Sequence, residues 1–321
     1  MVHYFRDLNR LNRLFFLWLL IYAALIFVGI WEVTTGDHLK TSALSQETRP
    51  WLLFVPTAVF TNQNDYAGYI VLTLPMLISF IRHYPRSTAR IVGIFLFIAG
   101  LWLLIETISR SCYIALVLGL AFWSLFLLRL KTKFKLVALT VLIALILLTA
   151  FPIQTRYFLN KLDYQVASLA NTIVSNEGNE AHGIRLRLIK NALHFFALSV
   201  GFGVGAGNID YYIKNFQIYP VDHYTNVHNW WAEILANYGV FVFGGYLIFY
   251  FSLLYELWKL YKKQSNRTEK MLCEGLLVGL ICFFISSASS SSIMAFRPQW
   301  IYFGFILSLL NYRRIKDKSK V

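Results

Sequence analysis

Long apolar runs separated by short polar segments repeat along the whole chain of 321 residues. A bilayer core is about 30 Å thick, so a helix needs roughly 20 mostly apolar residues to cross it. About eight runs approach or reach this length, which predicts an all-α, polytopic transmembrane helical bundle. We expect spans near residues 12–33, 66–81, 91–108, 112–129, 136–152, 230–258, 271–290 and 297–312.

Composition supports the same class of protein. Hydrophobic residues make up 57% of the chain and charged residues 14%, whereas about a quarter of the residues of a soluble domain are charged. This excludes an ordinary soluble enzyme. Residues 1–321 are therefore predicted to form a single integral membrane domain.

The basic residues give the predicted helices a direction. The net charge of +14 is also compatible with nucleic-acid binding. However, 20 of the 30 Lys and Arg residues fall at the two termini and in alternate gaps between the runs, as expected for cytoplasmic segments. We therefore predict a multi-pass protein of the cell membrane, with cytoplasmic N- and C-termini. Its environment is the lipid bilayer, and it has no nucleic-acid partner.

Two longer segments, 34–65 and 153–229, then fall on the extracytoplasmic side. The second is the only large hydrophilic stretch, and long loops in compact proteins are functional or disordered. Its glycines, aromatics and amphipathic section favour function, so we predict that this loop carries part of a site. The serine-rich run 286–292 is either a polar lining or, as we prefer, a set of small residues that lets helices pack closely.

Polar residues precede two of the predicted spans. In the first cluster, Asn64 belongs to Asn62–Asp65, and Asn and Asp are favoured N-cap residues. In the second, Arg110 stands between two serines, and arginine near membrane depth usually has a partner or a task. Glu106 lies four residues earlier, so an ion pair within one helix and an anion site both remain open for Arg110.

A third cluster lies on a predicted helix over residues 184–199 and in the glycine run that follows it. Arg187 shares a polar wedge with Lys190, Asn191 and His194, which indicates a solvated charge. Arg185 falls on the apolar face, where an unpaired charge is expensive, so it needs a buried partner or an anionic ligand.

The glycine run 201–208 differs from nucleotide-binding loops. Ala206 stands where G-x-G-x-x-G requires its last glycine, and no βαβ unit surrounds the run. Backbone N–H groups of such a loop can still approach an anion, so this interpretation stays open.

The fourth cluster begins at His228 and Asn229, at the outer mouth of the sixth predicted span, and includes Glu233. A histidine there can act as a general base, or it can be a polar anchor at the interface. Glu233 is placed to orient a base or to complete a polar network. The chain has no Asp-x-Asp pair, Walker loop, His-Glu-x-x-His or G-x-S-x-G, and we predict neither a cofactor nor a metal site.

Together the four clusters resemble the O-antigen ligase/polymerase superfamily of membrane glycosyltransferases, and they occur in the order of that family. The resemblance extends over about residues 50–312. The matching stretches are Asn62–Pro75 (NQNDYAGYIVLTLP), Ser109–Leu116 (SRSCYIAL), Ile184–Asn208, which ends in GFGVGAGN, and His228–Gly245 (HNWWAEILANYGVFVFGG). Many members have more spans than this chain.

The resemblance implies transfer of a glycan from an undecaprenyl-diphosphate carrier to the hydroxyl of a glycan or lipid-linked acceptor, outside the membrane and without a metal. It implies that Arg110 and Arg185 bind the diphosphate and that His228 binds or deprotonates the acceptor. Asn229, Glu233 and Asn64 are then supporting groups, with weaker roles for Arg187 and Arg297.

Two choices remain at this stage. We favour a surface-polysaccharide polymerase over a ligase, because no feature indicates a lipid A core acceptor. The alternative class is a transporter or flippase for a lipid-linked anionic substrate, in which ionisable groups lie near the bilayer midplane. The predicted grouping of charges at outer helix ends favours the enzyme. The sequence carries no signal for the sugar or the oligomeric state.

Overall fold

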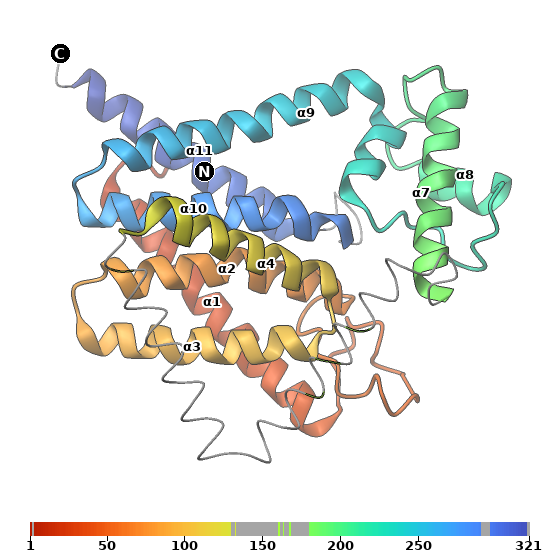
Figure 1. Ribbon diagram of the computed structural model, residues 1–321, viewed down its shortest axis with the longest axis horizontal. Coiled ribbons are helices and arrows are strands. Elements are labelled where there is room, and N and C mark those ends of the chain that lie inside the picture. The colour runs from red at the N-terminus through yellow and green to blue at the C-terminus, as the bar shows by residue number, and fades with distance from the viewer. Residues whose placement is uncertain are drawn as a thin grey trace.

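The computed structural model describes residues 1, 3–129, 180–289 and 296–319, with four isolated positions between 132 and 167. Within these ranges the regular elements are all helices (Figure 1). Their bounds are α1 Leu8–Thr35, α2 Gln63–His83, α3 Ser87–Glu106, α4 Arg110–Phe122 with the π-helical η1 Trp123–Leu127, α7 Glu180–Leu198, α8 Ile209–Phe216, α9 Trp230–Lys263, α10 Arg267–Ser286 with the 3-10 turn η2 Ser287–Ser289, and α11 Arg297–Lys318.

Six of the described helices are long and apolar enough to cross a membrane: α1, α2, α3, α4 with η1, α9 and α10. This confirms the prediction of an all-α, polytopic membrane protein. The predicted span 297–312 forms α11, which is not among the six. The predicted span 136–152 lies outside the described residues. The number of spans, about eight, therefore stays a prediction.

Helices α2 and α10 form the centre of the bundle. Both are buried along most of their length and pack against each other, with α3, α4, α1, α9 and α11 around them (Figure 1). Hydrogen bonds from polar side chains connect these helices. Ser79 Oγ of α2 donates to the Met271 carbonyl of α10 at 2.7 Å. Trp18 Nε1 of α1 donates to Thr73 Oγ1 at 2.9 Å. The three cysteines are buried and unbridged, consistent with packing residues.

A buried carboxylate closes the end of the bundle where α2 and η1 finish. Glu274 of α10 accepts hydrogen bonds from Arg82 at 2.8 Å, His83 at 2.8 Å and Trp123 at 2.7 Å. These donors come from α2 and η1, so one side chain joins three elements. A buried charge with this many partners is satisfied, whereas an unpaired one would be costly.

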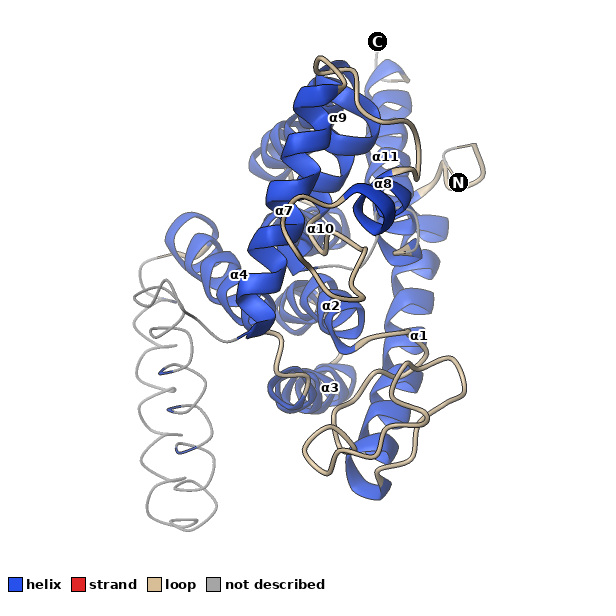
Figure 2. Ribbon diagram, turned by 90° about the vertical axis from the view of Figure 1, so that its right-hand side faces the viewer, coloured by secondary structure: helices blue, strands red, loops and turns tan. Residues whose placement is uncertain are grey.

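The opposite end of the bundle carries the polar segments. Helices α7 and α8 lie there, beside the first part of α9 (Figures 1 and 2). The loop 36–61 lies at the same end, next to the end of α1. Glu32 of α1 orders this loop because its carboxylate accepts N–H bonds from Thr57 at 2.8 Å and Ala58 at 2.6 Å. The loop leads directly into α2, so its anchoring fixes where α2 begins.

Candidate functional site

The first two polar clusters meet at the starts of α2 and α4. Ser109, which immediately precedes α4, donates from Oγ to Asn64 Oδ1 in the first turn of α2 at 2.9 Å. Arg110 is the first residue of α4. The structure therefore joins clusters that lie 45 residues apart in the chain.

The N-cap interpretation of the first cluster is confirmed, with Asn62 as the capping residue. Its side chain accepts the N–H groups of Asn64 at 2.9 Å and Asp65 at 3.1 Å. This satisfies two donors that a helix start otherwise leaves open. The side chain of Asn64 is consequently available for Ser109.

The turn between α3 and α4 sets the position of Arg110. Helix α3 ends at Glu106 and α4 begins at Arg110, with Ile108 in the left-handed region at φ 56°. This conformation is rare for a β-branched residue. Glu106 and Arg110 thus belong to successive helices, so the i,i+4 spacing of a single helix does not describe their relation.

Arg185 lies on α7, close to Arg110. Its side chain is half-buried, and burial followed by the charge of Arg110 lowers the pKa of its guanidinium. Leu188, Ala192 and Phe195 of the same helix are buried, which agrees with the predicted apolar face. Two neighbouring guanidinium groups repel each other and so form a local environment that favours an anion.

The predicted polar wedge of α7 is wrong for two of its members. Asn191 is fully buried, and its Oδ1 accepts the N–H groups of Ile218 at 2.9 Å and Tyr219 at 3.0 Å. Its amide donates to the Tyr219 carbonyl at 2.8 Å. Arg187 is half-buried, and its Nε is buried without a hydrogen-bond partner among the described residues. The segment after α8 covers this face, which periodicity alone does not reveal.

His228 lies directly before α9 in a left-handed conformation with φ 49°. Burial, and after it the charge of Arg185, lowers the pKa of its imidazole to about 4. The ring is therefore neutral near pH 7 and can accept a proton. Its Nδ1 is buried without a hydrogen-bond partner within the described part of the chain.

The neighbours of His228 fix the start of α9. Asn226 Oδ1 accepts the backbone N–H of His228 at 2.9 Å. Asn229 is the N-cap of α9 and accepts the N–H of Ala232 at 3.0 Å. Glu233 lies in the first turn and is buried. These contacts hold the backbone of His228 in place, so the direction of its side chain is built into the helix start.

The glycine run closes a break in α9. Helix α9 is interrupted at Gly239, whose φ is 79° and ψ 178°. Val204 and Gly205 donate their N–H groups to the carbonyls of Ala236 and Asn237 at 2.9 Å each, and Val240 donates to the carbonyl of Gly201 at 2.9 Å. The Val204 and Gly205 N–H groups are therefore engaged, which argues against the open interpretation of an anion-binding loop.

Close contact explains two of these glycines. A Cβ on Gly203 would lie 2.6 Å from the Asn237 carbonyl oxygen, and one on Gly239 would lie 2.4 Å from that of Phe202. Both residues also have positive φ, which only glycine adopts at little cost. The first part of α9, which carries Glu233, is thereby held at a fixed angle to the rest of the helix.

Arg297 lies elsewhere. It is exposed at the start of α11 and lines a groove of about 730 Å³ that α1, α2 and α11 border. Asp65 lines the same groove, but Arg110, Arg185 and His228 do not. The structure thus brings the segments of Asn64 and Arg110 together through Ser109. It places Arg185 near both Arg110 and His228. Arg297 lies on a separate surface.

Sequence reasoning missed the serines that link these elements. Besides Ser109, Ser111 of α4 bonds to Ser289 of η2. Ser286, Ser287 and Ser289 are buried, which agrees with the preferred packing role of the serine-rich run. The sequence feature that could have indicated these serines is their position, because each lies at or near an end of a predicted span.

The chemistry available here is that of two cations next to a neutral imidazole. Guanidinium groups bind phosphate oxygens through paired, charge-assisted hydrogen bonds. A neutral imidazole accepts a proton from a hydroxyl. In the part of the chain that the structure describes, no group of three His, Cys, Asp or Glu side chains is placed to hold a metal ion.

Comparison with known proteins adds two findings. Residues 94–247 match the O-antigen ligase family. The chain is also 31% identical over 316 residues to the teichuronic acid biosynthesis protein TuaE of Bacillus subtilis (strain 168). That alignment covers 98% of this chain, and the chain spans 63% of the length of the relative.

The family match contains the residues that the structure groups. Arg110, Arg185 and His228 all lie within residues 94–247, as do Asn229 and Glu233. Asn64 and Arg297 lie outside that range. The helical membrane fold and these two matches show that the chain is similar to the O-antigen ligase/polymerase-type proteins of the membrane.

Proposed function

We propose that this chain is a membrane glycosyltransferase of surface-polysaccharide assembly. It transfers glycan repeat units from an undecaprenyl-diphosphate carrier to the hydroxyl of a glycan or lipid-linked acceptor. The single observation that carries the proposal is the proximity of Arg110, Arg185 and His228. The charge of Arg110 lowers the pKa of Arg185, and the charge of Arg185 lowers the pKa of His228. The match to the O-antigen ligase family supports it.

In the proposed reaction, the acceptor oxygen attacks the anomeric carbon of the donor sugar while the bond from that carbon to the diphosphate oxygen breaks. His228 takes the hydroxyl proton, and the electron pair of the broken bond leaves with the diphosphate. Arg110 and Arg185 stabilise this developing negative charge, as preorganised donors do in a site shielded from water. The reaction needs no metal and no cofactor in this form.

The remaining residues have supporting roles in the proposal. Asn229 and Glu233 hold the start of α9, and Asn64 holds Ser109 next to Arg110. Arg187 has an unsatisfied, buried Nε and supplies a weaker contact to the leaving group. Arg297 has the weakest role, through the groove that it shares with Asp65.

We favour a polymerase over a ligase. The relative from Bacillus subtilis is described as a teichuronic acid biosynthesis protein, and nothing in this chain indicates a lipid A core acceptor. We also propose that the site faces the outside of the cell, with both termini cytoplasmic, because the basic residues concentrate at the other helix ends.

One observation favours the alternative, a transporter for a lipid-linked anion. Transporters use discontinuous helices at their substrate sites, and α9 is discontinuous at Gly239. In this chain, however, backbone groups of the glycine loop bond to both sides of the break. The backbone groups next to the break are thus bonded to the glycine loop and are not available to a transported ion. The enzyme therefore remains the better proposal.

Complementation of a deletion strain tests the proposal. We expect His228→Ala and Arg185→Ala each to abolish long-chain polysaccharide on gels while the protein still inserts in the membrane. Arg187→Ala serves as a milder, charge-matched control. Normal long chains with His228→Ala would refute its catalytic assignment. Mass spectrometry identifies the lipid-linked glycan that accumulates in the deletion strain. The side on which it accumulates separates the classes, because accumulation of repeat units on the cytoplasmic side indicates a transporter.

A further inference from the structure

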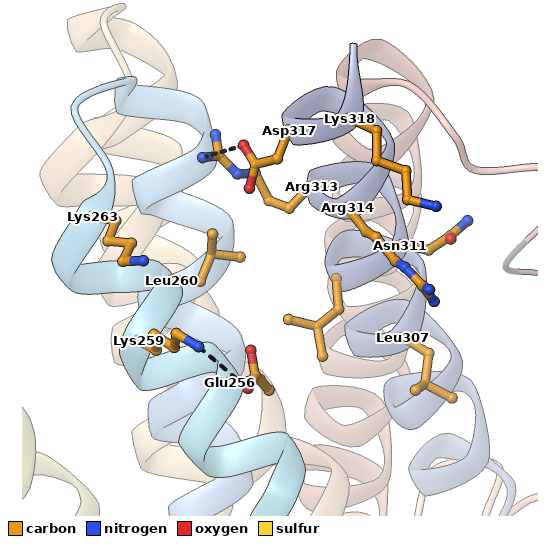
Figure 3. Close-up of a pocket in the computed structure, with 11 residues that line it drawn as sticks. Glu256, Lys259, Leu260, Lys263, Leu307, Asn311, Arg313, Arg314, Asp317 and Lys318 are labelled. Atoms are coloured by element: carbon orange, nitrogen blue, oxygen red, sulfur yellow. Dashed lines mark ion pairs between the residues drawn. The ribbon is translucent and has the colours of Figure 1, made fainter. Parts of the chain in front are cut away.

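A cleft of about 740 Å³ lies between the C-terminal parts of α9 and α11 (Figure 3). These parts lie at the opposite end of the bundle from α7 (Figure 1). Its walls combine apolar and charged side chains. The apolar ones include Leu260 of α9 and Leu307 of α11. The charged ones are Glu256, Lys259, Lys263, Arg313, Arg314, Asp317 and Lys318.

The charges in this cleft do not cancel. Five of the lining residues are basic and two are acidic. The acidic pair is already engaged, since Asp317 lies 3.0 Å from Arg313 and Glu256 lies 3.9 Å from Lys259 (Figure 3). A net charge of about +3 therefore remains on the cleft.

Three of these cations have no partner of their own. The side chains of Lys263, Arg314 and Lys318 make no hydrogen bond or ion pair with any residue that the structure describes. Each of the two helix C-termini contributes only about half a negative elementary charge. The three cations outweigh that contribution, so the cleft attracts an anion.

The cationic walls are held in place by a buried carboxylate. Glu269 of α10 is fully buried and accepts hydrogen bonds from Arg313 at 3.1 Å and from Lys316 at 2.5 Å. This fixes the last turns of α11 relative to the bundle. The cleft is thus preformed, and an anion that enters it does not have to order α11.

We infer that this cleft binds the phosphate head group of an anionic phospholipid. Helix α9 is long and apolar enough to span the membrane, and the cleft lies at its charged end. Basic pockets between helices at that depth bind anionic lipid head groups. Leu260 and Leu307 give the adjoining acyl chain an apolar wall, which a soluble phosphate does not need. The site is distinct from the proposed active site and independent of its chemistry.

Lipid retention by the purified, delipidated full chain tests this inference. The probes are phosphatidylglycerol and phosphatidylcholine, and the readout is the bound lipid in native mass spectra. We expect one saturable phosphatidylglycerol and a preference over phosphatidylcholine. The variant K263Q/R314Q/K318Q should weaken this binding by about tenfold or more. The control R13Q/R86Q/R267Q removes three exposed cations outside the cleft and should change it less than about twofold.

A fourth variant distinguishes lipid from free phosphate. Leu307→Asn should reduce the retention of phosphatidylglycerol. The concentration of inorganic phosphate that displaces the bound phosphatidylglycerol should stay unchanged. Equal losses in the two charge variants would overturn the inference, because the lipid would then respond to overall charge. Saturation by inorganic phosphate at the same affinity as the lipid, with no effect of Leu307→Asn, would overturn it as well.

Discussion

Arg185 of α7 lies close enough to His228, at the start of α9, for its charge to lower the pKa of the imidazole. The two residues are 43 positions apart and are brought together by the packing of α7 against the first part of α9. Burial is the larger cause of the shift, and the charge of Arg185 adds to it. The same arginine is itself affected by Arg110, so the three side chains form one electrostatic unit.

The first prediction concerns pH. The pKa of His228 in the folded protein is about 4, against about 6.5 for an unperturbed histidine. Its neutral form therefore persists from neutral pH down to about pH 5, and any stability linked to this group is lost as the pH falls below 6.5 and through 4. We expect the acidic limb of kcat/KM for polymer formation to lie near pH 4 to 5, since kcat/KM reports the free enzyme.

The matched variant for this prediction is Arg185→Gln. It removes the smaller of the two causes, so the pKa of His228 should rise part of the way towards 6.5. NMR of ¹³C-labelled histidine rings in the purified protein measures this, with His228→Gln to assign the signal. A wild-type ring that titrates near 6.5, or one that Arg185→Gln leaves unchanged, would contradict the geometry.

Some features of the candidate site and of the fold follow from local signals in the sequence. Arg185 stood out since a charge on an apolar helix face is expensive, and the structure has it half-buried. The Asn62 cap follows from residue type alone. The class of fold follows from run length, which the bilayer thickness determines.

Other features depended on contacts that no local pattern contains. The apolar run 230–258 is continuous, so it gave no sign that α9 breaks at Gly239. Asn191 has the helical spacing of a solvated residue but is covered by the segment after α8. The glycine run has the composition of an anion loop, whereas N–H groups within it bond to α9. In each case a distant segment decides the environment.

The second prediction uses two glycines with nearly the same backbone angle. Gly203 has φ 81° and Gly207 φ 75°, but a Cβ on Gly203 meets two backbone atoms at 2.6 Å, while one on Gly207 meets nothing within 4 Å. Both alanine variants incur about 1–2 kcal/mol of left-handed strain. Gly203→Ala must also displace the loop from α9, so we expect a clearly lower unfolding temperature and loss of activity in that variant only. Similar unfolding temperatures for the two variants would argue against the packing of this loop on the break.

The third prediction concerns the buried carboxylate of Glu274. Glu274→Gln removes the charge that Arg82 and His83 face, and breaking a buried pair costs about 3–5 kcal/mol. Glu256→Gln is the control, because Glu256 and Lys259 form an exposed pair at 3.9 Å, which is worth at most about 1 kcal/mol. Thermal unfolding in detergent should separate the two. If Glu256→Gln lost as much stability as Glu274→Gln, the loss of stability would depend on removal of a carboxylate and not on its burial.

The last prediction links α7 to the segment that covers it. Asn191→Ala removes three hydrogen bonds and leaves the N–H groups of Ile218 and Tyr219 without their acceptor, at a cost of about 1–3 kcal/mol for each buried group. Asn215→Ala is the control, since Asn215 is exposed and its amide, among the described residues, donates only to the Tyr211 carbonyl within its own helix. Hydrogen exchange at Ile218 and Tyr219 should accelerate in Asn191→Ala and stay unchanged in Asn215→Ala. Because α7 carries Arg185, polymer formation should fall in Asn191→Ala as well. Unchanged exchange with reduced activity would instead indicate that Asn191 acts on the substrate directly.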